Sequence, residues 1–478
     1  MTQELLLIAD DRTPAASGQY SELIDPATGV AWASVAQGGA ADIDRAVQAA
    51  AQAWPGWRRL SSRDRTRLLL RLAQLIRDNQ ESLAQLESRN VGKPLHDARI
   101  EVEMAADCFE FYAGAINKVG GTVNPVAAAG TSLTFREPIG VCGLIAPWNF
   151  PLVITAWKVA PALAMGNTLV LKPASLTPLT ALRLGQLALE AGIPPGVLNV
   201  VPGAGAEAGA ALIRHPLVRK ISFTGSTEVG SQVMRLAAND IKRVTLELGG
   251  KSANLVFADA DLERAVPQTL WSLVGNAGQD CCARSRLLIE RPIYDEFIDR
   301  LELAFKSLKL GLPQQADTEL GPLVSQGHRR RVQAYIDAGV QAGARLVCGG
   351  GPPQAEALQA GAFLAPTLFV DVEPQMQIFR EEIFGPVLCA LPFDTEDGAV
   401  AIANDSPYGL SGSIWTQDLS RALRLAKAIE TGVLSINTGH SIHLEAPFGG
   451  VKRSGLGREL GLAGLDPYSE LKSVFIAD

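Results

Sequence analysis

The sequence predicts an α/β protein built on parallel sheets that helices cover on both faces. Short apolar runs rich in β-branched residues alternate with amphipathic helical runs along most of the chain. The short runs are apolar throughout rather than at every second position, which is typical of strands buried on both faces of a parallel sheet. With 478 residues, 47% of them hydrophobic, the chain is long enough for two or three such domains.

The first 117 residues are predicted to be mostly helical. Residues 63–88 carry a wide apolar stripe with a charged opposite face, as expected of a helix lying on a core. We interpret this region as scaffold. The first twelve residues hold a short apolar run between Glu4 and two aspartates, without the basic flank or the length of a secretion signal, so export is not predicted.

Two segments have strand character but stand outside the alternating series. Residues 131–144 and 470–477 are predicted to form a protruding hairpin, or an edge that pairs with another subunit.

Residues 141–157 carry no charge, yet Pro147, Asn149 and Pro151 would break a membrane helix there. We expect a buried strand, a tight turn and a helix start instead.

Two series of strand and helix units follow, divided near Gly249 in "ELGGKS". The first series comprises residues 167–175, 177–192, 196–201, 203–215 and 220–226. The second comprises residues 253–259, 285–308 and 432–437. Since parallel sheets bind ligands at the carboxyl ends of their strands, we expect the functional residues at those ends.

Composition narrows the classes of partner. The formal net charge of −7 is modest and no Lys/Arg block occurs, so neither nucleic acid nor a membrane surface is a predicted partner. Six cysteines form neither CxxC pairs nor a dense framework, which indicates a reducing, cytoplasmic location and no metal site. They are Cys108, Cys142, Cys281, Cys282, Cys348 and Cys389.

The motifs give only a partial signal for a nucleotide. Gly203, Gly205 and Gly209 in "GAGAEAG" miss the GxGxxG dinucleotide fingerprint by one residue. Gly225 and Ser226, however, follow an expected strand at a helix start, where free backbone N–H groups and the helix dipole favour a phosphate. A glycine turn without a ligand is an equally good interpretation of the same residues.

Three residue types suit covalent carbonyl chemistry. A thiolate attacks the carbon, Asn149 in "PWNFP" is a rigid amide donor for an oxyanion, and Glu247 in "LELGG" is a carboxylate that activates water. Each has a structural alternative: an inert buried thiol, an asparagine bonding local backbone, and a salt-bridged glutamate. The residues alone do not decide between Cys281 and Cys282 in "GQDCCARSR".

Seven motifs in order give the chain a resemblance to the aldehyde dehydrogenase superfamily. They are "PWNFP" 147–151, "LKPAS" 171–175, "FTGST" 223–227, "LELGGKS" 246–252, "GQDCCA" 278–283, "EEIFGPV" 381–387 and "PFGGVKRSGLGRELG" 447–461. The resemblance covers nearly the whole chain. It implies a Rossmann-like cofactor-binding domain over residues 1–119 and 139–249, an α/β catalytic domain over residues 250–453, and a small β element for oligomerisation over residues 120–138 and 462–478.

The resemblance implies oxidation of an aldehyde to a carboxylic acid with NAD or NADP, through a cysteine thiohemiacetal and a thioester. Cys281 matches the nucleophile, Glu247 the general base, and Asn149 the oxyanion donor beside the backbone N–H of Cys281. Glu247 argues against a relative that passes the thioester to coenzyme A. The alternative from another class is a catalytically silent binding protein of the same fold. A homodimer or homotetramer is expected.

Further positions match the family's cofactor site. Lys172 matches the lysine on the adenosine ribose, Glu382 the carboxylate on the nicotinamide ribose, and Phe384 an aromatic near it. Ser175 stands where NAD-specific relatives commonly have an acid, which leaves NADP open. The implied cofactor residues are Ile145, Ala146, Pro147, Trp148, Lys172, Ser175, Gly205, Gly209, Phe223, Thr224, Gly225, Ser226, Leu248, Glu382 and Phe384.

The substrate tunnel of the family matches a mostly aromatic and apolar set, namely Met104, Asp107, Phe150, Trp157, Cys282, His440, Ile442 and Phe448. With Glu103 and Glu445, Asp107 suggests attraction of an ω-amino aldehyde; a solvated acid is the alternative. We expect Arg284 and Arg286 to pair with other residues at the surface or between the domains. The alternative is that these arginines lower the pKa of the cysteine thiol.

Overall fold

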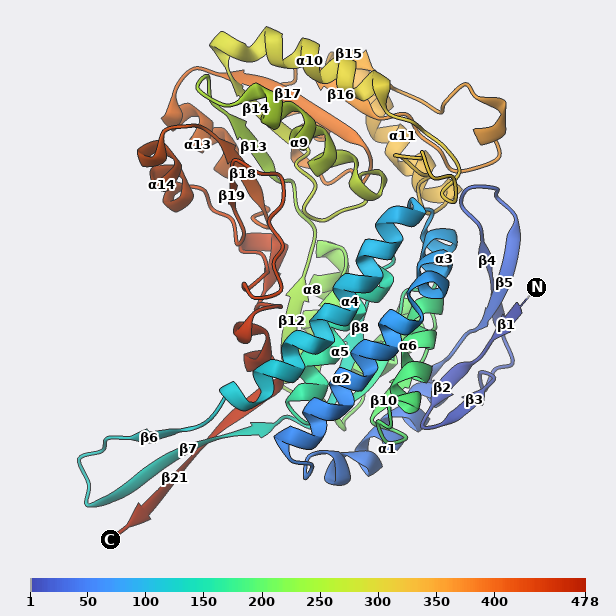
Figure 1. Ribbon diagram of the computed structural model, residues 1–478, viewed down its shortest axis with the longest axis vertical. Helices are drawn as coiled ribbons and strands as arrows, with labels where there is room; N and C mark the ends of the chain where they lie inside the picture. Colours follow the sequence, from blue (N-terminus) through green and yellow to red (C-terminus); the bar gives the residue numbers. More distant parts are fainter. Residues whose placement is uncertain (1) are drawn as a thin grey trace.

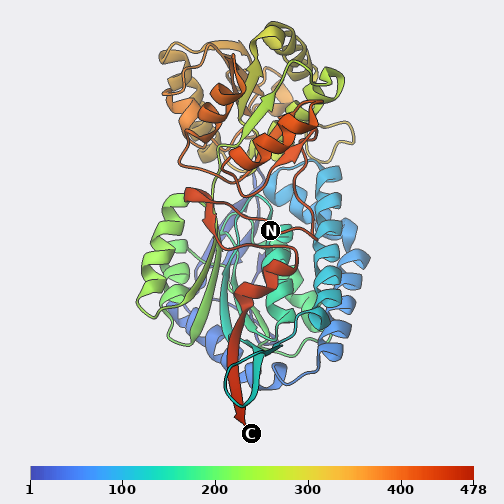
Figure 2. The same ribbon diagram turned by 90° about the vertical axis from the view of Figure 1, so that its left-hand side faces the viewer.

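The computed structural model describes residues 2–478, and Met1, which opens the first predicted domain, lies outside the described residues. Two α/β bodies stand one above the other, and a β appendage projects from the lower body (Figures 1 and 2). Both bodies combine parallel strands with covering helices, which confirms the predicted α/β class. Among the described residues, no helix combines the length and the apolar run needed to cross a membrane.

The lower body is built on an eight-stranded sheet in the order β20-β12-β11-β8-β9-β10-β2-β3. Five central strands run parallel: β8 (Val141–Ile145), β9 (Thr168–Lys172), β10 (Leu198–Val200), β11 (Val218–Thr224) and β12 (Arg243–Glu247). Antiparallel strands close both edges: β2 (Leu6–Ile8) and β3 (Asp11–Thr13) on one side, β20 (Gly455–Leu456) on the other.

Helices cover both faces of this sheet, as the uniformly apolar strands predict. One face packs against α1 (Ala40–Trp57), α7 (Ala210–Arg214) and α8 (Thr227–Ala238). The other face packs against a larger group of helices: α2 (Ser62–Asp78), α3 (Gln80–Val91), α4 (Leu95–Ala115), α5 (Pro151–Ala164) and α6 (Leu179–Glu190). Residues 141–157 form β8, a turn and the start of α5, as predicted.

The predicted helical character of the N-terminal region is wrong for residues 2–36, which contain five short strands. Besides β2 and β3 these are β1 (Thr2–Glu4), β4 (Tyr20–Ile24) and β5 (Ala31–Ala36), and the last three make a separate sheet in the order β1-β5-β4. Strands of three residues are too short to show a two-residue period, and Leu7 of β2 pairs with Val200, far away in the sequence. Helices do dominate residues 40–115.

The upper body holds a seven-stranded sheet in the order β15-β16-β17-β14-β13-β18-β19. Its strands are β13 (Ala253–Val256), β14 (Arg286–Glu290), β15 (Arg345–Cys348), β16 (Thr367–Val370), β17 (Val387–Phe393), β18 (Gly412–Trp415) and β19 (Ser435–Ile436), of which only the edge strand β15 is antiparallel. Its helices are α9 (Leu262–Val274), α10 (Tyr294–Ser307), α11 (Gln326–Gln341), α12 (Gln377–Arg380), α13 (Glu396–Asn404) and α14 (Leu419–Ala428), and a separate hydrophobic core fills this body.

The appendage is a three-stranded sheet in the order β21-β7-β6. The strands β7 (Gly130–Pro138) and β21 (Ser469–Ala477) pair antiparallel over nine residues, and β6 (Thr122–Asn124) closes the sheet. Figure 1 shows it extending away from both bodies. The predicted segment 131–144 is divided, because its second half, from Val141, is β8 of the eight-stranded sheet.

Candidate active site

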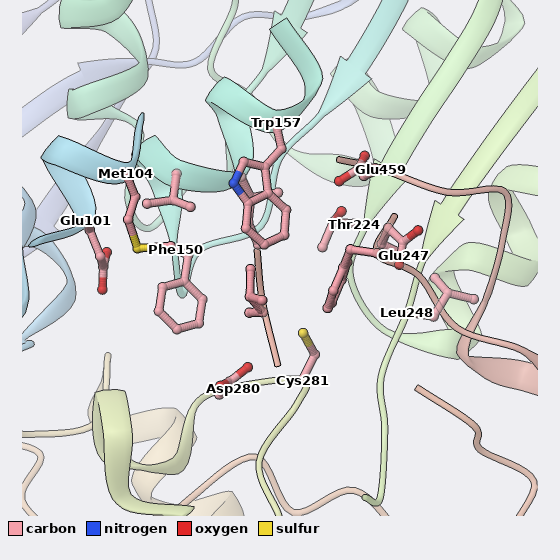
Figure 3. A pocket seen from close by; sticks show the side chains of 14 residues that line it. Glu101, Met104, Phe150, Trp157, Thr224, Glu247, Leu248, Asp280, Cys281 and Glu459 are labelled. Atoms are coloured by element: carbon pink, nitrogen blue, oxygen red, sulfur yellow. The ribbon is translucent and has the colours of Figure 1, made fainter. Parts of the chain in front are cut away.

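A cavity of about 550 Å³ lies between the two bodies, at the carboxyl ends of β11 and β12 (Figure 3). Residues from both bodies and from the C-terminal segment line it: Glu101, Met104, Phe150, Val153, Ile154, Trp157, Thr224, Glu247, Leu248, Asp280, Cys281, Ile442, Phe448 and Glu459. Most of the lining side chains are aromatic or aliphatic. The polar side chains among them are mainly carboxylates and the thiol of Cys281.

The two adjacent cysteines face different spaces. Cys281 lines the cavity, whereas Cys282 is buried and lines a neighbouring pocket with Trp271 and His440. The loop that carries them follows Gly278, whose φ is +72° and whose missing Cβ would lie 2.3 Å from the carbonyl carbon of Gly385. Glycine is therefore required at this turn, and it fixes the direction in which the next residues leave.

The surroundings of Cys281 favour the neutral thiol. A hydrogen bond with the thiol of Cys282 and burial together raise the pKa of Cys281 well above its usual range, and the charge of Asp280 adds to this shift. Reaction as a nucleophile requires the thiolate, so the proton of Cys281 has to leave when a substrate binds.

Asn149 is held by the loop that carries Cys281. Its side-chain Nδ2 donates to the carbonyl of Gln279 at 2.8 Å, and its own carbonyl accepts from Nζ of Lys93 at 2.9 Å and from Nδ2 of Asn276 at 2.8 Å. The alternative of a purely local backbone bond is therefore wrong. One N–H of the Asn149 side chain is used in this network, and the second is available to an oxyanion.

Glu247 is the last residue of β12 and is buried without a partner. Neither of its carboxylate oxygens has a hydrogen-bond partner within residues 2–478, so the salt-bridged alternative is wrong. Burial, and after it the nearby Glu459, raise the pKa of Glu247 well above its usual range. Gly449 makes room for this carboxylate, since a Cβ there would lie 2.7 Å from Oε1.

A second buried pair lies beside Glu247 and was not predicted. Oε1 of Glu459 accepts from Nζ of Lys158 at 2.5 Å and from Oγ of Ser222 at 3.2 Å, while Oε2 is buried and unpartnered. A signal was present, because Lys158 is the one charged residue in the otherwise uncharged helix α5. A buried lysine requires a buried acid, but the sequence does not indicate which acid.

A longer cleft continues from Cys281 across the carboxyl edge of the eight-stranded sheet. Its two connected parts have volumes of about 1240 and 1200 Å³. Fourteen of the fifteen implied cofactor residues line it: Ile145, Ala146, Pro147, Trp148, Lys172, Gly205, Gly209, Phe223, Thr224, Gly225, Ser226, Leu248, Glu382 and Phe384. Ser175 is absent from the lining. The lining also holds residues that were not predicted, among them Ala174, Val229, His328 and Arg331.

The middle of this cleft is suited to an anion. β11 ends at Thr224 and α8 begins at Thr227, with Ser226 as its N-cap, whose Oγ accepts from the N–H of Val229 at 3.3 Å. The N–H of Gly225 is already bonded to the carbonyl of Glu247 at 3.1 Å, so the first turn of α8 supplies the free donors. Oγ1 of Thr224 is buried without a partner beside them.

Lys172 and Ser175 meet at one backbone carbonyl. The carbonyl of Gly203 accepts from Nζ of Lys172 at 3.1 Å and from Oγ of Ser175 at 3.0 Å. Burial lowers the pKa of Lys172 to about 8, so this lysine titrates just above neutral pH.

Glu382, Phe384 and His328 form the end of the cleft near Cys281. Glu382 accepts from the N–H of Gly250 at 3.1 Å, and burial raises its pKa to about 7. Phe384 has a left-handed φ of +60°, and Nε2 of His328 lies 2.7 Å from its carbonyl oxygen. The rings of Phe384 and His328 each lie 5.2 Å from that of Trp148, edge to face, which completes an aromatic wall.

The substrate side requires three corrections. Asp107 does not line the cavity: with Glu103 and Glu110 it surrounds Arg77, whose Nη2 donates to it at 2.5 Å. Likewise Cys282 and His440 line the neighbouring pocket, and Glu445 is exposed, while Met104, Phe150, Trp157, Ile442 and Phe448 do line the cavity. The direction of Asp107 depends on which face of α4 meets the core, which spacing alone leaves open.

Arg284 and Arg286 are not surface residues. Both are buried: Arg286 donates to backbone carbonyls, among them that of Lys251 at 2.7 Å, and Arg284 donates to the carbonyl of Cys282 at 2.5 Å and to the hydroxyls of Ser413 and Ser441. These hydrogen bonds fix the start of β14, which directly follows the loop that carries Cys281 and Cys282.

Comparison with known proteins agrees with this geometry. The sequence model of the aldehyde dehydrogenase family matches residues 13–474. A mitochondrial aldehyde dehydrogenase of Leishmania tarentolae is 46% identical over 477 residues, covering 99% of this chain and 95% of that protein. A betaine aldehyde dehydrogenase of Bacillus subtilis is 43% identical over 476 residues, covering 99% and 97%. The structure of the NAD⁺ complex of an aldehyde dehydrogenase from Bacillus cereus superposes with a TM-score of 0.97 at 42% identity, covering 99% and 96%.

Proposed function

The chain belongs to the aldehyde dehydrogenase family, whose members oxidise aldehydes with NAD(P), and we propose that Cys281, Asn149 and Glu247 carry out this reaction here. The observation that carries the proposal is that an accessible thiol, a fixed amide donor and an unpartnered buried carboxylate meet at the junction of the cavity and the long cleft.

In the first half of the reaction Cys281 releases its proton to solvent water, and its sulfur bonds to the aldehyde carbon. The carbonyl oxygen becomes an oxyanion, which the free side-chain N–H of Asn149 and the backbone N–H of Cys281 stabilise. Lys93 and Asn276 support this step indirectly, because they hold the backbone of Asn149 in place.

The long cleft fits a dinucleotide. It offers a buried lysine at one end, the donors of α8 with the unpartnered Thr224 hydroxyl in the middle, and the Glu382 carboxylate near Cys281. When bound, NAD or NADP would accept the hydride that leaves the former aldehyde carbon as the adduct is oxidised to a thioester.

In the second half Glu247 takes a proton from water, and the hydroxide attacks the thioester and releases the carboxylic acid. Burial and the nearby Glu459 raise its pKa, so the ionised carboxylate of Glu247 is a stronger proton acceptor than that of an exposed glutamate. The bonded pair of Glu459 and Lys158 lies beside Glu247, so the proton is taken up at a buried site that contains other charges.

The matched pair of adjacent cysteines provides the test. Cys281→Ala is expected to abolish aldehyde-dependent reduction of NAD or NADP, whereas Cys282→Ala retains most of it, because Cys282 faces the other pocket. Steady-state absorbance of the reduced cofactor measures both variants. An active Cys281→Ala protein, with loss confined to Cys282→Ala, would reverse the assignment.

We further propose the domain roles and the assembly. The eight-stranded sheet supports a cofactor domain over residues 1–119 and 139–249, the seven-stranded sheet a catalytic domain over residues 250–453, and the appendage an oligomerisation element over residues 120–138 and 462–478. β21 is an edge strand with exposed apolar side chains, which supports pairing with a second copy and hence a homodimer or homotetramer. The cysteine pattern supports the cytoplasm as its location.

A further inference from the structure

We propose that Asp280 makes the substrate cavity selective for charge: it favours aldehydes that carry an ammonium group near the carbonyl and disfavours those that carry a carboxylate. This inference rests on the proposed function. It replaces the expectation that Asp107 attracts an amino aldehyde, since Asp107 lies outside the cavity, paired with Arg77.

Asp280 has the position that this role requires. It directly precedes Cys281, it lines the cavity and the neighbouring pocket, and a carboxylate oxygen lies within 4.8 Å of Sγ of Cys281. Figure 3 shows Asp280 on the same side of Cys281 as Phe150, with Glu247 and Glu459 on the other side. Asp280 therefore faces the part of the cavity that the body of a bound aldehyde occupies.

The charge of Asp280 is not neutralised by an ion pair within residues 2–478. Its Oδ1 accepts from the N–H of Cys282 at 2.8 Å. Arg284, the nearest arginine in the sequence, donates instead to the Cys282 carbonyl and, at 3.0 and 2.8 Å, to the hydroxyls of Ser413 and Ser441. Burial raises the pKa of Asp280, which reflects the free-energy cost of holding a carboxylate there, and a cationic substrate group would offset that cost.

The other acid on this side of the cavity is already paired. Glu101 forms an ion pair with the buried Lys93, and Nζ of Lys93 also lies 4.5 Å from the centre of the Phe150 ring and bonds the carbonyl of Asn149. On the opposite side Glu459 is bonded to Lys158, and Glu247 is assigned to the reaction itself. Among the acids of the cavity in residues 2–478, Asp280 is the one that neither forms an ion pair nor is assigned to the reaction, although Arg284 and Lys93 are near enough to lower its pKa.

The short distance between the Asp280 carboxylate and Sγ of Cys281 determines which carbons of the substrate lie next to Asp280. Once the aldehyde carbon is bonded to Sγ, the next two or three carbons lie beside a carboxylate only 4.8 Å or less from that sulfur. An ammonium group on one of these carbons can form a charge-assisted hydrogen bond with Asp280, whereas a carboxylate there meets like charge in a poorly solvated space.

The test compares three aldehydes of similar length: 3-aminopropanal, butanal and succinic semialdehyde. Butanal has the same number of heavy atoms as 3-aminopropanal and no charge. For the parent protein we expect kcat/KM for 3-aminopropanal to exceed that for succinic semialdehyde by about 10²-fold, since like and unlike charges at such a site differ by several kcal/mol. In Asp280→Asn this ratio should fall by about tenfold or more.

Asparagine is chosen because its Oδ1 can still accept from the N–H of Cys282, so the local turn is kept and only the charge is removed. Removal of the charge also changes the pKa of Cys281, but that acts on all three aldehydes alike and cancels in the ratio. Asp107→Asn is the matched control, because it removes an acid outside the cavity, and it should leave the ratio unchanged.

An unchanged ratio in Asp280→Asn, or an equal fall in Asp107→Asn, would overturn the inference. Failure of the parent protein to oxidise butanal would instead count against the proposed function itself. If Asp280→Asn does not fold, inhibition of butanal oxidation in the parent protein decides: propylammonium should inhibit at lower concentration than propionate, and the reverse order would overturn the inference.

Discussion

At the scale of single residues, the direction of a side chain separates residues that spacing cannot separate. Cys281 and Cys282 are adjacent and chemically identical, yet only Cys281 faces the cavity. The residues alone left this choice open, and the family motif indicated it. Asp107 is the opposite case, because it matched a tunnel position but points toward Arg77. Neither Lys158 nor Glu459 was singled out, since their pairing joins residues 301 positions apart.

Ser175 and Lys172 give a prediction on cofactor choice. Ser175 offers a hydroxyl where a carboxylate would repel the 2′-phosphate of NADP, and Lys172 shares its Gly203 carbonyl. We expect the parent enzyme to accept NADP, and Ser175→Glu to lower kcat/KM for NADP at least about tenfold more than for NAD. Leu176→Glu is the control, because this neighbouring side chain is 47% exposed and, unlike that of Ser175, is not bonded beside Lys172 at the Gly203 carbonyl.

The pKa of Lys172 adds a pH dependence to the same prediction. Because burial lowers it to about 8, Lys172 is cationic below pH 8 and loses its charge above. The affinity for NADP relative to NAD should therefore decline as the pH rises through 8, measured as the ratio of the two dissociation constants. A parent enzyme that excludes NADP, or a ratio unaffected by Ser175→Glu, would show that another residue determines the choice.

At the scale of elements, the sequence predicts best where a pattern is local. Strands β9 and β11 are nearly uniform apolar runs that alternate with helices, so their type and their place in a parallel sheet could be inferred; β8 was expected as a buried strand, but outside the alternating series. The turn from β11 to α8 was predicted from Gly225 and Ser226, and the N-cap bond of Ser226 agrees. The five N-terminal strands were missed because their pairing partners, not their own sequence, determine their conformation.

At the scale of the whole molecule, the active site depends on how the two bodies meet. The lower body supplies Asn149 and Glu247, the upper body supplies Cys281 and Glu382, and the C-terminal segment returns to add Phe448 and Glu459. The period of the hydrophobic residues along the chain carries no information about how the two bodies meet. The matched motifs do, because each of the seven carries residues that line the cavity or the long cleft.

The appendage gives a prediction on assembly. Leu471 is 64% exposed and Phe475 49% exposed, and both belong to the edge strand β21. Since a long edge strand with exposed apolar side chains is stable when it pairs with another chain, we expect a dimer or tetramer in solution. The double substitution Leu471→Asp, Phe475→Asp should shift the mass measured by light scattering toward the monomer.

Leu419→Asp is the control for assembly, because Leu419 is 71% exposed on α14, in the upper body. It should leave the mass unchanged. A parent protein that is monomeric at micromolar concentration, or a double variant that retains the parent mass, would contradict the assigned role of the appendage.

We propose that Cys281 forms a thioester which Glu247 then helps water to cleave. The most direct measurement is rapid mixing of Glu247→Gln with an aldehyde and cofactor, followed by mass spectrometry of the cysteine-containing peptide. We predict about one equivalent of reduced cofactor, turnover slowed by roughly 10²–10⁴-fold, and an acyl group on Cys281. Glu445→Gln, an exposed glutamate, should behave like the parent. Parent-like turnover of Glu247→Gln, or an acyl group on Cys282, would contradict the account.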